Sequence, residues 1–286
     1  MPLANKCRVL ITGSEGFIGT ALKQCLTKEG YDVWGIDCVD KAESQVIKAD
    51  LLDIAETAKA LEECLPFSAV IHTAALAPGK AIPSGDSCER LNTQMTENLL
   101  KAIKGQCPRL IFLSSVAVYG EDQRGTPVST NDEVRPATDY GRSKLQCEKL
   151  VIESNIKNCD ILRLAPVYDK SHMKNVKKRV CMPGPFSVKL RFWPSPQYSL
   201  CDIETVVQCV LNLLNQPPCG HVIRNVAEPR PYSQNELLTW FPGISFPLPT
   251  FIFKPFYYAT YLLPNRVGYP YRCTYWKLFE LNVYQT

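Results

Sequence analysis

Residues 11–19 read ITGSEGFIG and lie between a β-branched, strand-like run and a stretch whose apolar residues have helical spacing. A pyrophosphate binds at such a strand-to-helix turn through backbone N–H groups and the helix N-terminus, and any Cβ would hold it away. We expect Gly13 to permit the tight turn, Gly16 the close approach of a ligand, and Gly19 the contact between helix and strand. The spacing is Gly-x-x-Gly-x-x-Gly rather than Gly-x-Gly-x-x-Gly, so the loop by itself does not prove a dinucleotide site.

Strand-like and helix-like segments alternate through the first half of the chain. This alternation predicts a parallel sheet covered on both faces, and right-handed crossovers make it a doubly wound α/β fold of the Rossmann type. The predicted strands cover residues 6–12, 31–37, 46–49, 69–73, 110–115, 160–164 and 221–226. The predicted helices cover residues 16–29, 53–64, 87–104, 138–156 and 203–215.

The second half has a different composition, because most of the 22 prolines lie at or after Pro166. Apart from the helix at 203–215 and the strand at 221–226, we expect loops and short elements there. The predicted division is a dinucleotide-binding domain of residues 1–165 plus about 201–226. A small substrate-binding lobe is predicted for about 166–200 plus 227–286.

The composition argues against several classes of protein. The net charge of +4 is small and scattered, which argues against a nucleic-acid partner. The chain has 13 cysteines without zinc-ligand spacing and starts with a strand-like run rather than a secretory leader, so we expect reduced thiols, a cytoplasmic location and no metal site. The apolar stretch 244–264 is broken by prolines and Lys254, so no transmembrane segment is expected. It could cover an apolar substrate or touch a membrane surface, but a packed C-terminal segment is the favoured interpretation.

Two acidic positions follow the second and third predicted strands. Asp37 ends the second strand, where a carboxylate can accept both hydroxyls of a ribose and would repel the 2′-phosphate of NADP. NAD is therefore the expected cofactor. Asp50 and Leu51, after the third strand, are predicted to contact the adenine edge. A Rossmann-like sheet that binds no dinucleotide stays open as the alternative.

Tyr140 and Lys144 lie one helical turn apart and share a face of the predicted helix at 138–156. A pair at this spacing can arise by chance, so its position matters: it follows the strand that ends in Ser115. A free tyrosine has a pKa of about 10, and a neighbouring ammonium and the positive nicotinamide ring both favour its phenolate. Tyr140 would then remove a substrate hydroxyl proton while hydride passes to the nicotinamide. Ser115 would hydrogen-bond the same oxygen, and Lys144 would also hold the nicotinamide ribose.

Together these motifs resemble the extended short-chain dehydrogenase/reductase family, specifically its NAD-dependent epimerase/dehydratase group. The similarity runs from residue 6 to about residue 240, and the order of the motifs makes it specific. The matching segments are the glycine loop at 13–19, DLLD at 50–53, VIHTAA at 70–75, LSSVAVYG at 113–120 and YGRSK at 140–144.

The resemblance implies a catalytic set of Ser115, Tyr140 and Lys144. It also implies that NAD is contacted by Gly13, Gly16, Phe17, Ile18, Gly19, Asp37, Asp50, Leu51, Thr73, Ala74, Ala75, Tyr140, Lys144 and Val167. Relatives pair two helices of each chain in a dimer. We therefore expect a homodimer in which the helices predicted at 87–104 and 138–156 form a four-helix bundle.

The family oxidises a carbon of a nucleotide-sugar, often UDP-linked, and either returns the hydride or lets the keto sugar react. Its sugar dehydratases carry an acid after the catalytic Ser or Thr. Val116 and Ala117 occupy those places here, which disfavours dehydration. The resemblance therefore implies a nucleotide-sugar 4-epimerase-like enzyme, acting on a UDP-hexose in polysaccharide biosynthesis.

Two positions depart from the pattern of nucleotide-sugar epimerases. Pro166 replaces an Asn, and Gln197 replaces an Arg, that contact the diphosphate in many of them. The candidate substrate contacts are Lys174, Asn175 and Arg191.

Two other functions stay open. One is an NAD(P)-dependent reductase or dehydrogenase of a keto-sugar or a hydroxysteroid-like alcohol, suggested by the aromatic residues in 251–261. The other is a non-catalytic, cofactor-binding regulatory protein, although the three catalytic residue types are all present.

Overall fold

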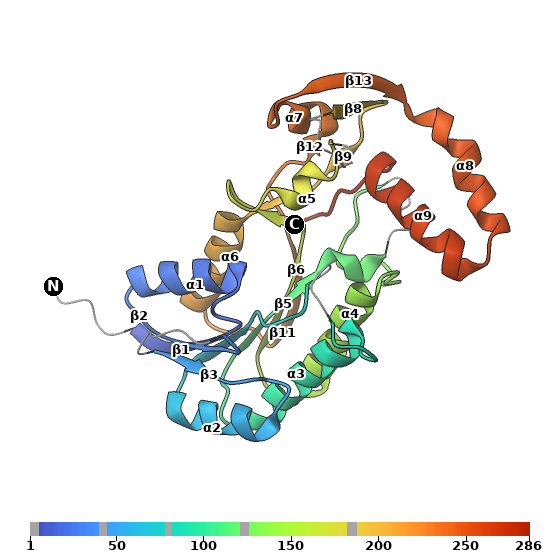
Figure 1. The fold of residues 1–286 in the computed structure, drawn as a ribbon. Coiled ribbons are helices and arrows are strands. Elements are labelled where there is room, and N and C mark those ends of the chain that lie inside the picture. The colour runs from blue at the N-terminus through green and yellow to red at the C-terminus, as the bar shows by residue number, and fades with distance from the viewer. Residues whose placement is uncertain (1–5, 40–44, 78–81, 121–125, 182–187) are drawn as a thin grey trace.

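The computed structural model describes residues 6–39, 45–77, 82–120, 126–181 and 188–286. Its main element is a seven-stranded, entirely parallel sheet in the order β3-β2-β1-β4-β5-β6-β11 (Figure 1). The strands are β1 (Lys6–Thr12), β2 (Tyr31–Asp37), β3 (Val46–Lys48), β4 (Ala69–His72), β5 (Leu110–Ser115), β6 (Cys159–Leu164) and β11 (His221–Val226). The predicted doubly wound α/β fold is confirmed.

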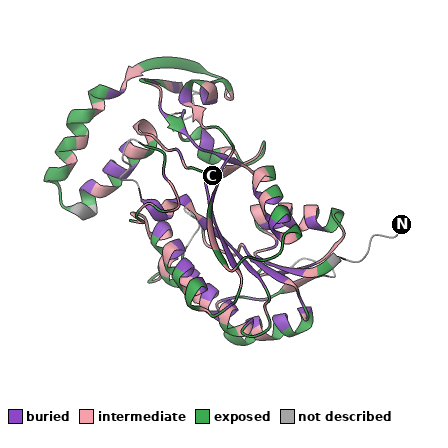
Figure 2. Cartoon of the chain, turned by 180° about the vertical axis from the view of Figure 1, so that it is seen from behind, coloured by how far each residue is buried: buried purple, intermediate pink, exposed green. Residues whose placement is uncertain are grey.

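Helices cover both faces of this sheet because each carries an apolar stripe. On one face α1 and α6 bury Leu22 and Val206, and on the other α2, α3 and α4 bury Leu61, Leu99 and Val151. Figure 2 shows the sheet as a band of buried residues with exposed residues on the outer faces of the helices. The bounds are α1 (Phe17–Lys28), α2 (Ile54–Cys64), α3 (Cys88–Ala102), α4 (Asp139–Glu153) and α6 (Ile203–Asn215).

The strand order reverses between β1 and β4, because β2 and β3 lie on one side of β1 and the later strands on the other. In an open parallel sheet, ligands bind beyond the carboxyl ends of the strands at such a reversal. The glycine loop follows β1, Thr73 follows β4 and Ser115 ends β5. The topology therefore brings three predicted site segments together at the edge formed by the carboxyl ends of the strands.

His72, the last residue of β4, is buried beneath this edge. Its Nδ1 lies 2.6 Å from Thr12 Oγ1, and its Nε2 lies 3.1 Å from Thr96 Oγ1. Burial, with a smaller repulsion from Lys144, lowers the pKa of His72 to about 3. The imidazole is therefore neutral at physiological pH and links β1, β4 and α3 through hydrogen bonds.

Replacing His72 with glutamine is expected to weaken the acid sensitivity of the fold. The unfolded histidine binds a proton below its ordinary pKa of 6.5, whereas the folded one binds it only near pH 3. Stability contributed by neutral His72 is therefore present above pH 6.5 and lost as the pH falls toward 3, by about 1.4 kcal/mol per pH unit. Urea unfolding measured between about pH 6 and pH 4 should show that the unfolding free energy of the variant changes less steeply with pH, by the equivalent of about one bound proton. The matched control is the exposed His221 changed to glutamine; if both variants keep the wild-type slope, His72 is not the buried neutral group.

The remaining segments form three small strand pairs and short helices at one end of the molecule (Figure 1). The pairs are β7 (Val167–Tyr168) with β10 (Cys201–Asp202), β8 (Val188–Trp193) with β13 (Ile244–Pro249), and β9 (Gln197–Tyr198) with β12 (Tyr232–Ser233). The helices are α5 (Lys174–Lys177), α7 (Gln234–Thr239), α8 (Lys254–Ala259) and α9 (Asn265–Phe279). Single 3-10 turns form η1 (Val116–Tyr119), η2 (Thr250–Phe253) and η3 (Thr260–Leu262).

Two predictions for the C-terminal region are wrong. Loops and short elements were expected after residue 227, but α9 has 15 residues and continues through Pro270. Residues 244–264 were expected to pack against the protein, yet Ile244 is 71% exposed and Leu262 is 88% exposed. Among the described residues no helix is both long and apolar enough to cross a bilayer.

Candidate active site

The glycine loop passes from β1 into α1 under tight steric limits. Gly13 has a φ of +69°, and a Cβ there would lie 2.7 Å from the backbone of Ala74. A Cβ on Gly19 would lie 2.1 Å from the carbonyl oxygen of Gly13, so the helix rests directly on the loop. Gly16 is different, because its Cβ would meet only the Gly13 carbonyl oxygen, at 3.2 Å. As the N-cap of α1, Gly16 also has no side chain to cap the first N–H groups, which suits an oxyanion site.

Asp37 lies beside this loop at the end of β2. Its carboxylate accepts hydrogen bonds from the backbone N–H groups of Glu15 at 3.0 Å and Val39 at 3.1 Å. The ribose of a dinucleotide held by the loop would reach this carboxylate. A second carboxylate lies in the loop itself, and its environment is not predictable from the motif. The side chain of Glu15 is almost fully buried and pairs with Lys23 Nζ at 2.6 Å.

Thr73 and Ala74, both predicted NAD contacts, shape the loop from the β4 side. Thr73 Oγ1 donates to the carbonyl oxygen of Thr12 at 2.7 Å and lies 3.2 Å from that of Gly13. Ala74 stands where a side chain on Gly13 would be. These two residues therefore hold the glycine loop in place, and their contact with NAD stays a prediction.

Ser115, Tyr140 and Lys144 come together from β5 and α4. Ser115 at the end of β5 lies beside Tyr140 of α4, and its side chain interacts with the phenol. Lys144 is buried, and its Nζ donates to the carbonyl oxygen of Leu113 at 2.8 Å and lies 6.0 Å from the centroid of the Tyr140 ring. The three predicted catalytic side chains are thus assembled, and their roles in a reaction stay predictions.

Burial sets the charge state of this cluster. It raises the pKa of Tyr140 to about 12, and the interaction with the Ser115 side chain offsets only part of the increase. Burial also lowers the pKa of Lys144. The phenol of Tyr140 is therefore protonated at neutral pH, and the expected lowering of its pKa by Lys144 and the nicotinamide ring together stays a prediction.

The segment YGRSK is held in place by contacts that its spacing does not reveal. A Cβ on Gly141 would lie 2.5 Å from the carbonyl oxygen of Ala117, so α4 approaches η1 closely only with glycine there. Asn92, buried on α3, donates to Ser143 Oγ at 3.0 Å and accepts from the backbone N–H of Leu76 at 2.7 Å. It joins α4 to the segment after β4. Sequence reasoning missed Asn92 because its partners are 51 and 16 residues away.

The other residues predicted to contact a ligand follow β3 or lie on elements of the second half of the chain. Asp50 is exposed, and its carboxylate accepts from the backbone N–H of Leu52 at 2.9 Å, while Leu51 is buried. Val167 lies on β7, paired with Cys201 of β10. The three candidate substrate residues are exposed: Lys174 and Asn175 on α5 and Arg191 on β8.

The parallel sheet, the glycine loop with Asp37, and the Ser–Tyr–Lys cluster at the end of β5 define a dinucleotide-dependent enzyme of the short-chain dehydrogenase/reductase type. The sequence model of the NAD dependent epimerase/dehydratase family matches residues 9–220. The chain belongs to this family and is an NAD-dependent enzyme of the oxidoreductase or isomerase type. NAD fits the residues present, because the loop has no Cβ in the way and Asp37 offers an acceptor rather than a cation.

Individual relatives differ in how much of the chain they match. UDP-glucose 4-epimerase of Vibrio cholerae is 28% identical over 277 residues, covering 87% of this chain and 80% of that protein. D-erythronate dehydrogenase of Cupriavidus necator is 32% identical over 161 residues, covering 50% of this chain and 49% of that protein. A short-chain dehydrogenase/reductase superfamily protein of Agrobacterium tumefaciens, solved with bound NAD, superposes with a TM-score of 0.71 at 22% identity, covering 85% and 86% of the two chains. At 22% identity, this structural similarity shows the fold alone.

Proposed function

We propose that the protein is a 4-epimerase of a nucleotide-linked hexose, with UDP-hexose as the substrate class, that works in polysaccharide biosynthesis. The observation that carries the proposal is the placement of Ser115 and Tyr140 beside Lys144, at the same edge of the sheet as the glycine loop. The similarity to UDP-glucose 4-epimerase of Vibrio cholerae over most of both chains supports the choice of reaction.

In this proposal Tyr140 exchanges a proton with the substrate hydroxyl, and Ser115 orients that hydroxyl. Lys144 stabilises the phenolate and holds the nicotinamide ribose. NAD, when bound, supplies a hydride acceptor and a positive ring that favours the phenolate. Val116 is buried and, like Ala117, offers no acid or base, so elimination of water has no proton donor at these two positions.

We further propose that residues 1–165 with about 201–226 bind NAD and that about 166–200 with 227–286 bind the sugar nucleotide. The diphosphate needs cationic or amide donors. Lys174, Asn175 and Arg191 are the candidates, since Pro166 has no amide donor in its side chain and Gln197 has no positive charge.

The purified protein should convert UDP-glucose to UDP-galactose with no cofactor added, because an epimerase returns the hydride to the same sugar. Chromatography of the sugar nucleotides over time measures the exchange, and denaturing the protein releases bound NAD for quantification. If NAD is present on the protein and no UDP-hexose changes its configuration, the epimerase proposal is rejected.

The second candidate is a net dehydrogenase or reductase of a secondary alcohol, such as a keto-sugar or a hydroxysteroid-like compound. The 32% identity to D-erythronate dehydrogenase over half of the chain favours it, as do Pro166 and Gln197. Turnover that requires stoichiometric NAD or NADH would establish it.

The third candidate is a non-catalytic, cofactor-binding regulatory protein. It is kept because one relative is named as a subunit of an enzyme: rat methionine adenosyltransferase 2 subunit beta is 28% identical over 161 residues, which cover 47% of its own length. The assembled Ser115, Tyr140 and Lys144 weigh against it.

The proposed assembly is a cytoplasmic homodimer in which α3 and α4 of two copies form a four-helix bundle. The two helices lie side by side on the outside of the sheet, and Arg142 of α4 pairs with Glu89 of α3 at 3.1 Å (Figure 1). Sedimentation velocity at micromolar concentration tests the dimer, and a monomer there would reject it.

A further inference from the structure

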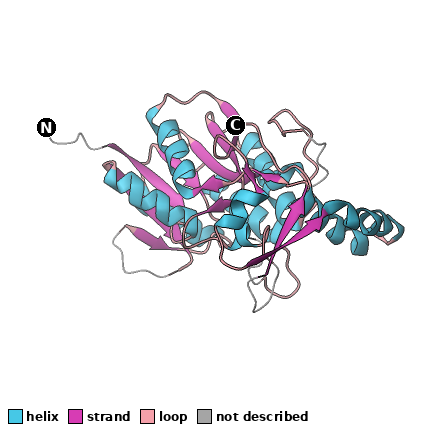
Figure 3. Cartoon of the chain, turned by 90° about the horizontal axis from the view of Figure 1, so that it is seen from above, coloured by secondary structure: helices cyan, strands magenta, loops and turns pink. Residues whose placement is uncertain are grey.

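Residues 250–279 form a hairpin rich in aromatic side chains, called the aromatic hairpin below. Its first arm consists of η2, α8 and η3, and its second arm is α9. Figure 1 shows this hairpin extending away from the sheet and its flanking helices, and Figure 3 shows it projecting from the rest of the chain when seen from above. The hairpin also carries several strongly exposed apolar side chains.

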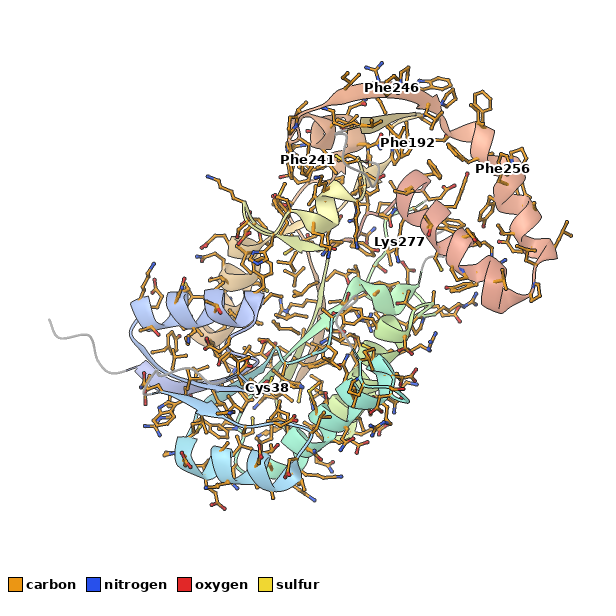
Figure 4. All side chains as sticks on the ribbon, viewed as in Figure 1. Cys38, Phe192, Phe241, Phe246, Phe256 and Lys277 are labelled. Atoms are coloured by element: carbon orange, nitrogen blue, oxygen red, sulfur yellow. The ribbon has the colours of Figure 1, made fainter. Side chains whose placement is uncertain are left out.

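Large apolar side chains gather on this outward side. Phe256 on α8 is 70% exposed and Leu262, next to the turn into α9, is 88% exposed. Figure 4 shows Phe256 on the hairpin and Phe246 on β13 at the outer side of the molecule. The exposed set on the hairpin is Phe251, Ile252, Phe256, Tyr258, Tyr261, Leu262, Leu263, Val267 and Tyr271. Exposed apolar side chains concentrated on one short segment of a fold are typical of an interaction surface.

The hairpin holds its own shape, so these side chains are not exposed by a loose fold. Arg272 Nη1 donates to the carbonyl oxygen of Thr260 at 2.9 Å, and Trp276 Nε1 donates to Tyr257 Oη at 2.9 Å. A Cβ on Gly268 would lie 2.2 Å from the same Thr260 oxygen, so the two arms touch backbone to backbone. The two arms also stack aromatic rings, with centroids 4.4 Å apart for Tyr257 and Tyr275 and 4.8 Å apart for Phe253 and Phe279, so the hairpin has a packed inner side as well as exposed apolar residues.

The charge of this region identifies the kind of partner. Residues 237–279 contain no Asp or Glu but include Lys254, Arg266, Arg272 and Lys277. Lys254 and Lys277 are exposed on the hairpin. Arg272 is buried within the hairpin, whereas the two lysines lie among exposed tyrosine and phenylalanine side chains. This combination complements the anionic headgroups and the amphipathic interface of a lipid bilayer. A second copy of the same hairpin would bring like charges together instead.

We propose that the aromatic hairpin docks the protein on the surface of an anionic lipid bilayer, without crossing it. Its apolar side chains enter the headgroup region, as those of interfacial amphipathic helices do, while Lys254 and Lys277 contact lipid phosphates. The hairpin, and not the sheet or its helices, is the attachment point. This inference does not depend on the reaction proposed for the active site.

Flotation of the full-length protein with lipid vesicles tests the proposal. Vesicles of phosphatidylcholine with about 30 mol% phosphatidylglycerol should bind the wild type at least about tenfold more tightly than vesicles of phosphatidylcholine alone. The double change Phe256→Ser with Leu262→Ser should weaken binding to the anionic vesicles at least about tenfold. Lys254→Gln should weaken it about fivefold and reduce its dependence on salt.

The control is Val39→Ser with Ile54→Ser, which removes two exposed apolar side chains, 51% and 45% exposed, from the segment after β2 and from α2. This control should bind vesicles as the wild type does. Circular dichroism of all variants checks that the fold is kept. The proposal is overturned if the wild type ignores anionic vesicles or if the hairpin and control variants bind alike. It is equally overturned if sedimentation shows a dimer that only the hairpin variant dissociates and vesicles bind neither form.

Discussion

Replacing Tyr140 with phenylalanine is expected to lower turnover by about a hundredfold to ten-thousandfold, because the variant has no group to exchange a proton with the substrate hydroxyl. The change removes one oxygen from a position next to Ser115 and keeps the ring beside Lys144. Affinity for NAD should stay within about threefold of the wild type, since the glycine loop and Asp37 are untouched. Sugar-nucleotide exchange gives the rate, and calorimetric titration gives the affinity.

Tyr119→Phe is the matched control for this variant. Tyr119 is buried, and its hydroxyl bonds Asn225 at 2.7 Å and Arg163 at 3.0 Å, away from the Ser115–Tyr140 pair. Its loss should cost about 1–3 kcal/mol of unfolding free energy and leave turnover near the wild-type value. Full activity in the Tyr140 variant would remove this tyrosine from the mechanism and would favour the regulatory interpretation.

The pH dependence of the wild type offers a second measurement on the same residue. Burial holds the pKa of Tyr140 near 12 in the cofactor-free protein, so its phenol is protonated at neutral pH. If positive charge from bound NAD favours the phenolate, ultraviolet difference titration against Tyr140→Phe should show ionisation at lower pH with NAD than without it. Identical titrations with and without NAD would place the nicotinamide away from Tyr140.

Gly19→Ala is expected to damage both the fold and the cofactor site. The new Cβ would lie 2.1 Å from the carbonyl oxygen of Gly13, and backbone atoms cannot yield as a flexible side chain does. We expect a loss of about 3 kcal/mol in unfolding free energy and at least a tenfold loss of NAD affinity. Denaturant titration and calorimetry measure the two effects separately.

The variant Gly16→Ala is expected to lower the affinity for NAD while leaving the stability of the fold nearly unchanged. Its Cβ would meet only the Gly13 carbonyl oxygen at 3.2 Å, so stability should stay within about 1 kcal/mol of the wild type. NAD affinity should nevertheless fall at least about tenfold, because the methyl group occupies the place of the pyrophosphate. Unchanged NAD affinity in this variant would show that the pyrophosphate does not lie on the N-terminus of α1.

Much of the fold and part of the site follow from short-range patterns. The predicted strand at residues 31–37 has the observed bounds of β2, and the helix at 203–215 those of α6, because apolar periodicity reports which face of an element is buried. The glycine loop is predictable because its requirement, a backbone without Cβ atoms at these positions, is visible in the residue type. Tyr140 and Lys144 share a helix turn, so their proximity also follows from spacing alone.

Contacts between distant segments could not be predicted in this way. Asn92 binds α4 and the segment after β4, and neither partner is near it in sequence. The raised pKa of Tyr140 depends on burial, which several elements create together. The helix α9 was missed since Pro270 and its many aromatic residues disfavour a helix locally, whereas bonds from Arg272 and Trp276 across the hairpin stabilise it.

Short-range patterns thus predict a parallel α/β sheet, a dinucleotide loop and a tyrosine–lysine pair, because each depends on local backbone geometry or on the period of a single element. The folded arrangement of the whole chain sets which groups are desolvated, how Asn92 and His72 link segments of the site, and which apolar residues of the aromatic hairpin are exposed. Burial is a property of several segments at once, so the same run of aromatic residues is compatible with a packed core or with an exposed surface until the whole chain is folded.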